Sequence, residues 1–281
     1  MKNFKIIIAL VCLSLVLINC QKEDEQLVGL ANEEIVQGLK EALKVGTDSA
    51  TKRLTATNGY YKDQAVKLLL PAQVNQSITS FKSKTISVFG IGTLTGEDIY
   101  TKGIPGFVNP LSSKEDELIL GINRAAESAA KDAGSIFFDA IVGMSISDGS
   151  NILFGGVDSA ATIYLNANTR PQLFSKFEPK IGSALNTLKI GNKSVVQSYE
   201  DYVSDYNNIL NTKVPTGIVQ KKSIAELMGI QIVLATNLSE YSTNKGLDGL
   251  FVKIKGEERK IRKAPLHRVT DILKKIFGAL D

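Results

Sequence analysis

The chain has 281 residues and a formal net charge of +4, and 43% of its residues are apolar, which is typical of one folded domain or two small ones. Its two cysteines are Cys12 and Cys20, and its one histidine is His267. This composition excludes a multi-histidine metal site, and any domain that begins after Cys20 lacks a cysteine nucleophile, a cysteine-based zinc site and an iron–sulfur cluster.

The N-terminal segment resembles a bacterial lipoprotein signal. Lys2 and Lys5 precede an apolar stretch over 6–18, which has the length of a signal-peptide core and is too short to span a bilayer. Cys20 follows, so we predict a signal peptide over 1–19 and lipidation of Cys20 by a diacylglyceryl thioether and an amide-linked acyl chain. Several acyl chains hold a protein on a membrane essentially permanently. The alternative is an ordinary secretory signal with a chance cysteine.

A polar, mostly acidic run follows Cys20 directly. It resembles the signal with which some Gram-negative bacteria export lipoproteins to the cell surface, and the alternative is a solvated spacer. We therefore expect a lipid-anchored protein of the outer membrane, at the cell surface or, alternatively, on the periplasmic face. Residues 20–31 form the predicted lipidated tether, and 32–281 form a single domain. The predicted export signal consists of Gln21, Lys22, Glu23, Asp24 and Glu25.

Hydrophobic periodicity predicts helices from residue 32 onward. Asn32 is a suitable N-cap, and a stripe of apolar residues every four positions carries a first helix toward Leu54. A short second helix is predicted over 63–70, and Pro71 opens a third. Residues 83–110 are rich in glycine and proline and predict a long loop with room for one small hairpin.

The second half of the chain continues the helical pattern. Ser113 opens two successive apolar helices, after which Ser147 or Asp148 is expected to cap a short helix and Asp158 the next one. Thr169 is expected to cap a separate helix with a proline in its first turn. A tyrosine stripe (Tyr199, Tyr202, Tyr206) predicts a buried helix face, 238–263 predicts a long helix, and the last helix is expected to begin at Pro265 with Leu266, Val269 and Leu273 facing the core. The predicted fold is an all-α bundle of about nine or ten helices.

Three blocks of sequence carry a family resemblance. The first contains Asn123-Arg124-Ala125-Ala126-Glu127, the second runs from Asp148 to Phe177-Glu178-Pro179, and the third runs from Gly246-Leu247-Asp248-Gly249 to Phe277-Gly278. Together they resemble an uncharacterised bacterial family catalogued as domain of unknown function 4197. The resemblance implies a helical, frequently exported domain without a known activity. Ala264 departs from the family pattern, which has an aspartate before the proline, and the 83–110 loop is longer than usual.

Several polar residues could form an interhelical network or line a cleft for an anionic or polar ligand. Arg124 with Glu127, and Glu258 with Arg262, have the spacing of ion pairs within a helix. Asp148 and Asp158 could offer oxygens to a divalent cation, but their spacing is not that of an EF-hand and helix capping explains both. We predict no metal and no cofactor. The candidate network consists of Asn123, Arg124, Glu127, Asp148, Asp158, Glu258, Arg262 and Arg268.

The sequence assigns no catalytic residue, so we expect a non-enzymatic binding or interaction module that is attached to the membrane by its N-terminal lipid. Its partner would be a protein or a small ligand, and nucleic acid is not expected. A basic stretch at 253–275 is either a solvated helix face or a contact with anionic headgroups. The alternative function is a cell-envelope hydrolase that uses carboxylates such as Glu127, Asp148 or Glu258 in a cleft.

Overall fold

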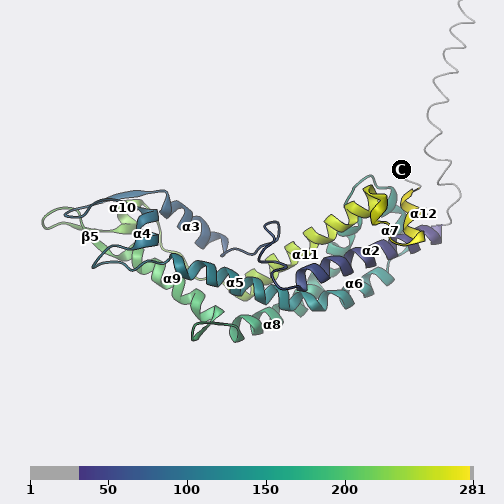
Figure 1. Ribbon diagram of the computed structural model, residues 1–281, viewed down its shortest axis with the longest axis horizontal. Coiled ribbons are helices and arrows are strands. Elements are labelled where there is room, and N and C mark those ends of the chain that lie inside the picture. The colour runs from purple at the N-terminus through teal and green to yellow at the C-terminus, as the bar shows by residue number, and fades with distance from the viewer. Residues whose placement is uncertain (1–31, 279–281) are drawn as a thin grey trace, which may run out of the picture.

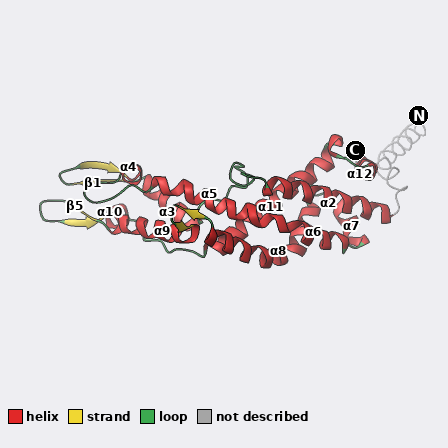
Figure 2. Ribbon diagram, turned by 60° about the horizontal axis from the view of Figure 1, so that its bottom comes forward, coloured by secondary structure: helices red, strands yellow, loops and turns green. Residues whose placement is uncertain are grey.

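The structure, a computed structural model, describes residues 32–278 (Figure 1). The predicted signal peptide, Cys20 and the acidic run therefore lie outside the described residues. The described chain forms an elongated, curved helical body with the start of the first described helix at one extremity and two β-hairpins at the other (Figures 1 and 2). We call these the proximal end and the distal end.

Long helices build most of the body, which confirms the predicted all-α multi-helix class. Toward the proximal end lie α2 (Asn32–Thr55), α6 (Ala133–Val142), α7 (Ile146–Phe154), α11 (Leu238–Lys263) and α12 (Asp271–Gly278). Through the middle run α5 (Ser112–Ala129) and α8 (Ala160–Thr187), with the 3₁₀ turn η1 (Ala130–Asp132) between α5 and α6. Toward the distal end lie α3 (Ala72–Lys82), α4 (Gly96–Lys102), α9 (Val195–Asn211) and α10 (Ile224–Met228).

The strands form three short antiparallel hairpins within the described residues. The pairs are β1 (Thr85–Val88) with β2 (Gly92–Thr95), β3 (Lys189–Ile190) with β4 (Lys193–Ser194), and β5 (Lys213–Pro215) with β6 (Lys221–Ser223). The hydrophobic core runs the length of the body, because each long helix turns one apolar stripe inward. On α8, for example, Leu165, Leu173, Phe177 and Ile181 are buried.

The predicted helix over 63–70 is wrong. This segment is a series of turns between α2 and α3. The Val66 and Lys67 N–H groups donate to the Asp63 carbonyl, but no helix continues from this turn, because the Asn123 amide of α5 pairs with both the N–H and the C=O of Leu68. Local periodicity favoured a helix here, and tertiary hydrogen bonds overrode it.

The predicted loop over 83–110 is only partly a loop. The small hairpin is confirmed as β1 and β2, with Ile86 and Val88 buried. The helix α4 was not predicted, although Thr95 caps it by accepting a hydrogen bond from the Asp98 N–H at 3.0 Å. Gly96 at the start of α4 and Gly103 directly after it are typical of turns, so the sequence pattern indicated a loop here.

The expected helix start at Thr169 is also wrong, because α8 continues unbroken past Pro171 and Pro179. Thr169 is buried inside the helix, where its hydroxyl donates to the Leu165 carbonyl at 2.6 Å. A proline inside a helix costs a backbone hydrogen bond, and here the buried stripe of α8 outweighs that cost.

The last helix begins later than predicted. Residues Pro265–His267 form a separate 3₁₀ turn, η2, in which His267 is exposed as expected, and Leu266 and Val269 are exposed instead of facing the core. The buried residue of this connection is Arg268, whose guanidinium donates to the carbonyls of Ile261 and Arg262 and so fixes the turn after α11. Leu273, Ile276 and Phe277 of α12 are buried.

Among the described residues, no single helix is long and apolar enough to cross a membrane. One pair of helical stretches, Ser112–Val142 and Ile146–Phe154, passes by length and composition together, but it is bent by 104°.

Candidate functional site

The predicted polar residues lie in three separate places. Asn123, Arg124 and Glu127 of α5 form what we call the central clasp. Glu258 and Arg262 of α11, with Arg268 after η2, form what we call the proximal ion cluster. Asp148 lies in the first turn of α7, and Asp158 lies in the connection between α7 and α8.

The central clasp holds the turn segment between α2 and α3. Asn123, which is fully buried, accepts from the Leu68 N–H at 2.9 Å and donates to the Leu68 carbonyl at 2.8 Å. Arg124 pairs with Glu127 at 2.6 Å, as the spacing predicted, and donates to the Asn58 side chain at 2.9 Å. The other oxygen of Glu127 accepts from the Tyr60 N–H at 3.3 Å. Asn123 and Glu127 therefore serve as hydrogen-bond partners for backbone groups of the irregular segment, and Arg124 holds Glu127 and the Asn58 side chain.

Tyr60 extends the clasp to α11. Its hydroxyl donates to the Gly246 carbonyl at 2.8 Å, and burial together with the nearby Glu127 charge raises its pKa far above the usual range. Gly249, one turn further along α11, lets the Tyr60 ring pack closely, since a Cβ at this position would lie 2.8 Å from the ring. The first and third sequence blocks therefore meet around this tyrosine.

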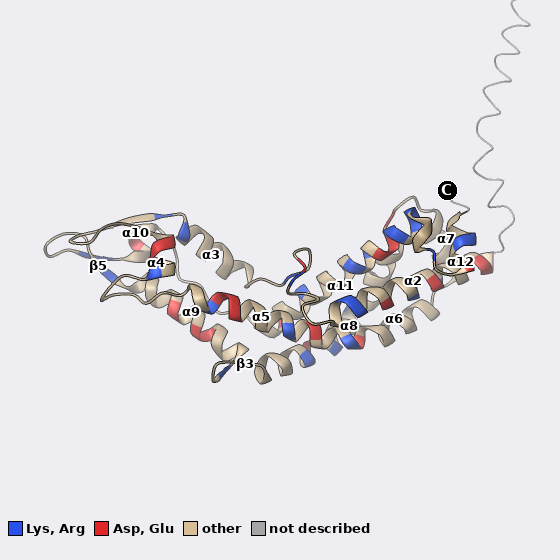
Figure 3. Cartoon of the chain, viewed as in Figure 1, with Lys and Arg blue, Asp and Glu red and all other residues tan. Residues whose placement is uncertain are grey.

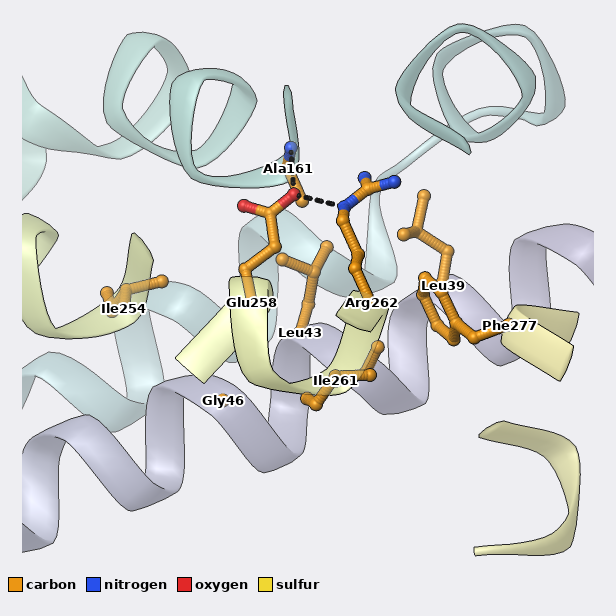
Figure 4. Close-up of a pocket in the computed structure, with 10 residues that line it drawn as sticks. Leu39, Leu43, Gly46, Ala161, Ile254, Glu258, Ile261, Arg262 and Phe277 are labelled. Atoms are coloured by element: carbon orange, nitrogen blue, oxygen red, sulfur yellow. Dashed lines mark hydrogen bonds and ion pairs between the residues drawn. The ribbon is translucent and has the colours of Figure 1, made fainter. Parts of the chain in front are cut away.

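Glu258 is the centre of the proximal ion cluster (Figure 4). Its carboxylate accepts from the N–H groups of Ala161 and Thr162 at 3.0 and 2.9 Å, and from the Thr162 hydroxyl at 2.7 Å. These N–H groups belong to the first turn of α8, where a helix leaves its donors unpaired and its dipole favours a negative charge. Glu258 therefore caps α8 from another helix.

Arg262 balances the buried carboxylate. Its Nε lies 2.9 Å from the Glu258 carboxylate, and its Nη2 donates to the Ile152 carbonyl near the end of α7 at 3.0 Å. Its guanidinium also lies 5.8 Å from the centre of the Phe277 ring in α12. The side chains of Glu258 and Arg262 are only 8% and 10% exposed, so one ion pair joins α7, α8, α11 and α12 in the protein interior.

The cavity beside this pair is too small for a ligand. Leu39, Leu43, Ile254 and Phe277 close around Glu258 and Arg262, as Figure 4 shows, and leave about 10 Å³. That volume is at the lower limit for a single water molecule. Neither Glu127 nor Asp148 lines the cavity, so no second candidate carboxylate shares it with Glu258.

The two clusters are not brought together. Gly246, which meets the central clasp, and Glu258 are 12 residues apart on α11, a rise of about 18 Å. Among the described residues, the candidates on α5 and α11 thus fall into two polar clusters, each with its own partners, rather than into one network.

The two aspartates have local roles. Asp148 accepts from the Ser145 N–H and hydroxyl in a capping box, and these hydrogen bonds lower its pKa. The N-cap of α7 is therefore Ser145 and not Ser147 or Asp148 as expected. Asp158 does not cap α8, because Ser159 holds that position; it pairs instead with Lys263, whose hydrogen bond lowers the pKa of Asp158. The described residues contain no group of three or more potential metal ligands.

Most of the basic stretch at 253–275 is balanced by carboxylates, which favours the solvated-helix interpretation (Figure 3). Its members pair with residues of α2, of the turn segment, of the α7–α8 connection and of α11 and α12 themselves. The pairs are Lys253–Asp63, Lys260–Glu257, Arg262–Glu258, Lys263–Asp158, Lys274–Asp271 and Lys275–Glu34.

Two features of the distal half escaped prediction from the sequence. The first is a chain of hydroxyls in the core: Tyr100 donates to Glu115 at 2.6 Å, and its oxygen lies 2.6 Å from that of Tyr202. The tyrosine stripe on α9 was predicted to be buried, and it is, but Tyr100 lies in the unpredicted α4. The second is a set of exposed apolar residues at the hairpin turns, where the sequence offered only the signal of a turn.

The family comparison covers most of the chain. A sequence profile described as "Protein of unknown function (DUF4197)" matches residues 29–91 and 108–278. The interruption, 92–107, falls within the stretch that the sequence predicted to be longer than the family pattern, and the structure places β2 and α4 there. No curated protein and no solved structure matches the chain.

Proposed function

This chain belongs to the DUF4197 family of proteins of unknown function, and we propose that it is a lipid-anchored, non-enzymatic interaction module of the outer membrane. In this proposal Cys20 carries the lipid, residues 20–31 are the tether, and the elongated helical body presents its surface to a partner in the envelope or outside the cell.

The observation that carries this proposal is that the candidate carboxylates Glu127 and Glu258 are bound by groups of their own chain. Glu127 binds the Tyr60 backbone and Arg124, and Glu258 caps α8 and pairs with Arg262. A general acid or base needs contact with its substrate, whereas these groups are surrounded by partners from their own chain. This arrangement favours an interaction module over a carboxylate-based hydrolase.

The shape of the body supports the same proposal. The start of α2, which follows the predicted tether, lies at one extremity, and the paired hairpins lie at the other (Figure 1). A body attached at its proximal end would carry the hairpins away from the attachment point. The cavity at the ion cluster, about 10 Å³, is too small for a small-molecule ligand, so Glu258 and Arg262 do not line a binding pocket.

The anchor is tested by mass spectrometry of the mature N-terminus in the native host. We expect Cys20 to be the first residue, with a diacylglyceryl thioether and an acylated amine, and Cys20→Ser to abolish both the modification and fractionation with the outer membrane. An unmodified mature N-terminus would refute the anchored module. Digestion of intact cells with external protease then separates the cell surface, where the body is cut, from the periplasmic face, where it is protected.

A further inference from the structure

Two hairpins lie side by side at the distal end (Figures 1 and 2). The β1–β2 hairpin turns through Phe89, Gly90 and Ile91, and the β5–β6 hairpin turns through 216–220. The Phe89 N–H donates to the Pro215 carbonyl at 2.8 Å and so ties the two hairpins together. We call the two turns together the paired tip.

The paired tip exposes large apolar side chains. Ile218 and Val219 are each 90% exposed, and Phe89 and Ile91 are 56% and 45% exposed. The strands behind them are ordinary, since Ile86, Val88 and Val214 face the core and are buried. Hairpin turns usually carry glycine, asparagine, aspartate or serine, and gathered exposed apolar residues commonly mark an interaction site.

The charges around the paired tip have one predominant sign. Residues 85–95 and 213–223 contain three lysines and no carboxylate. Lys213, Lys221 and Lys222 are all exposed. Glu226, at the base of the second hairpin, accepts from the Ser223 N–H. The largest cause that lowers the pKa of Glu226 is that hydrogen bond, and the charges of Lys213 and Lys222 lower it further. The Glu226 carboxylate therefore partly balances these two lysines. The contrast is with the 253–275 stretch, where most basic residues have direct ion-pair partners.

We propose that the paired tip docks into the interfacial region of an anionic lipid bilayer. Ile218, Val219 and Phe89 would enter the boundary between headgroups and acyl chains, and the lysines would lie at the phosphates. Apolar residues next to basic ones bind membranes by area burial plus attraction to anionic lipid. Lysine stems can lie along apolar surface while their ammonium groups stay at the headgroups. The lysine charges are complementary to anionic headgroups. Because the turns protrude, their apolar side chains can reach the boundary between the headgroups and the acyl chains.

The position of the paired tip gives this docking a consequence. It lies at the opposite extremity from the start of α2. A chain anchored by its N-terminal lipid, as the proposed function has it, would therefore touch lipid at two separated places, either on a second bilayer or on a distant part of the same one.

A tryptophan reporter tests the proposal, because the chain has no tryptophan of its own. The full lipidated chain with Val219→Trp is reconstituted into neutral phosphatidylcholine donor vesicles and mixed with protein-free acceptor vesicles that contain phosphatidylglycerol. We expect the emission to move to shorter wavelengths and to be quenched by brominated lipid. Placing the brominated lipid in the acceptor or in the donor tells which bilayer the tip enters. Leu234→Trp, at an exposed site in the connection beside α9, is the matched control and should not respond.

Charge variants test the electrostatic part. Lys221→Gln with Lys222→Gln should weaken the capture of anionic acceptors by about tenfold or more, and high salt should weaken it as well. Lys52→Gln with Lys62→Gln, which changes the net charge equally at exposed sites in the middle of the body, should leave capture unchanged. All of these side chains are exposed, so the unfolding midpoint should stay constant in every variant.

Three results would overturn the proposal. The emission of the tip tryptophan could stay unchanged with every vesicle, or neutral acceptor vesicles could be bound as well as anionic ones. Donor vesicles could also cluster without acceptors, which would show that the tip binds a second copy of the chain. A reporter that responds to an envelope protein and to no lipid would assign the tip to a protein partner instead. Flotation of the chain with donor vesicles reports the lipid anchor separately. If the anchor fails, the emission of the tip reporter with added anionic vesicles still decides the tip proposal.

Discussion

The proximal and distal halves of the body stabilise their cores with different polar groups. At the proximal end the buried polar groups include ions, and these ions lie where helices end: Glu258 at the start of α8, Arg262 near the end of α7 and Arg268 after α11. In the distal half they are tyrosine hydroxyls, and they lie where α3, α4, α5 and α9 pack side by side. Helix ends leave several backbone groups unpaired and attract charge, whereas helix sides do not. The difference therefore follows from which parts of the helices meet.

The strongest test of this comparison is Glu258→Ala. It removes the cap of α8 and leaves the Arg262 guanidinium, whose side chain is 10% exposed, without its carboxylate. Removing one partner of a buried ion pair costs about 3–5 kcal/mol, so we expect a large loss in the free energy of unfolding measured with urea. Asp158→Asn, which removes an exposed carboxylate from its pair with Lys263, should leave the midpoint unchanged. Equal effects of the two variants would show that the buried ions do not hold the proximal half.

The central clasp, which lies between the two halves, is tested by Asn123→Ala. The change leaves the N–H and the C=O of Leu68 without partners in the core. Buried backbone groups that lose their hydrogen bonds cost about 1–3 kcal/mol each, so we expect destabilisation of about 3 kcal/mol. Asn168→Ala removes an exposed side chain that bonds only to its own helix, at Tyr164, and should be almost silent in the same urea titration.

The two halves also differ in how far the sequence predicts them. The periodicity of α11 gave both of its ends, Leu238 and Lys263, because a long amphipathic helix repeats its signal many times. The pairs Arg124–Glu127 and Glu258–Arg262 followed from spacing alone, since a single helix fixes the distance between its own residues. Most of the distal elements are strands of two to four residues or helices of five to seven, whose patterns are too short to stand out.

Contacts between distant segments were beyond the sequence in both halves. Nothing in the local pattern of Asn123 indicates that its partner is Leu68, and nothing near Glu258 indicates the start of α8, 97 residues away. The sequence therefore singles out the candidate residues as polar positions, while their grouping into a central clasp and a proximal ion cluster required the packing of the helices.

Substitution of two glycines of α11 by alanine compares the packing of a single helix at the central clasp and nearer the proximal end. At Gly249, opposite the central clasp, a Cβ would lie 2.8 Å from the Tyr60 ring and 3.1 Å from Val66. At Gly256, nearer the proximal end, a Cβ would meet nothing within 4 Å. Alanine in place of helical glycine contributes about 1 kcal/mol of helix propensity, and overpacking costs about 1–3 kcal/mol. Gly256→Ala should therefore raise the thermal midpoint and Gly249→Ala should lower it. Two shifts of the same sign would contradict the close approach at Tyr60.

The smallest expected effect, and the one that distinguishes the distal half, is on alkaline stability. Burial raises the pKa of Tyr206 to about 12, and a hydrogen bond with Ser77 opposes this rise. Because the folded pKa lies above the unfolded value near 10, this tyrosine contributes stability below about pH 10, and the contribution is lost as the pH rises from about 10 toward 12.

Tyr206→Phe keeps the edge-on ring contact with Phe81 and removes the titrating hydroxyl. We expect it to cost about 1 kcal/mol at neutral pH for the lost hydrogen bond, and to make the fall in urea stability between pH 10 and 12 less steep. Ser77→Ala is the matched control, because it removes the same hydrogen bond but leaves the buried hydroxyl to titrate, so its alkaline fall should stay at least as steep as that of the unmodified chain. If both variants showed the same pH dependence, the buried hydroxyl of Tyr206 would have no part in alkaline unfolding, and the contrast between buried ions at the proximal end and buried tyrosine hydroxyls in the distal half would lose its support at high pH.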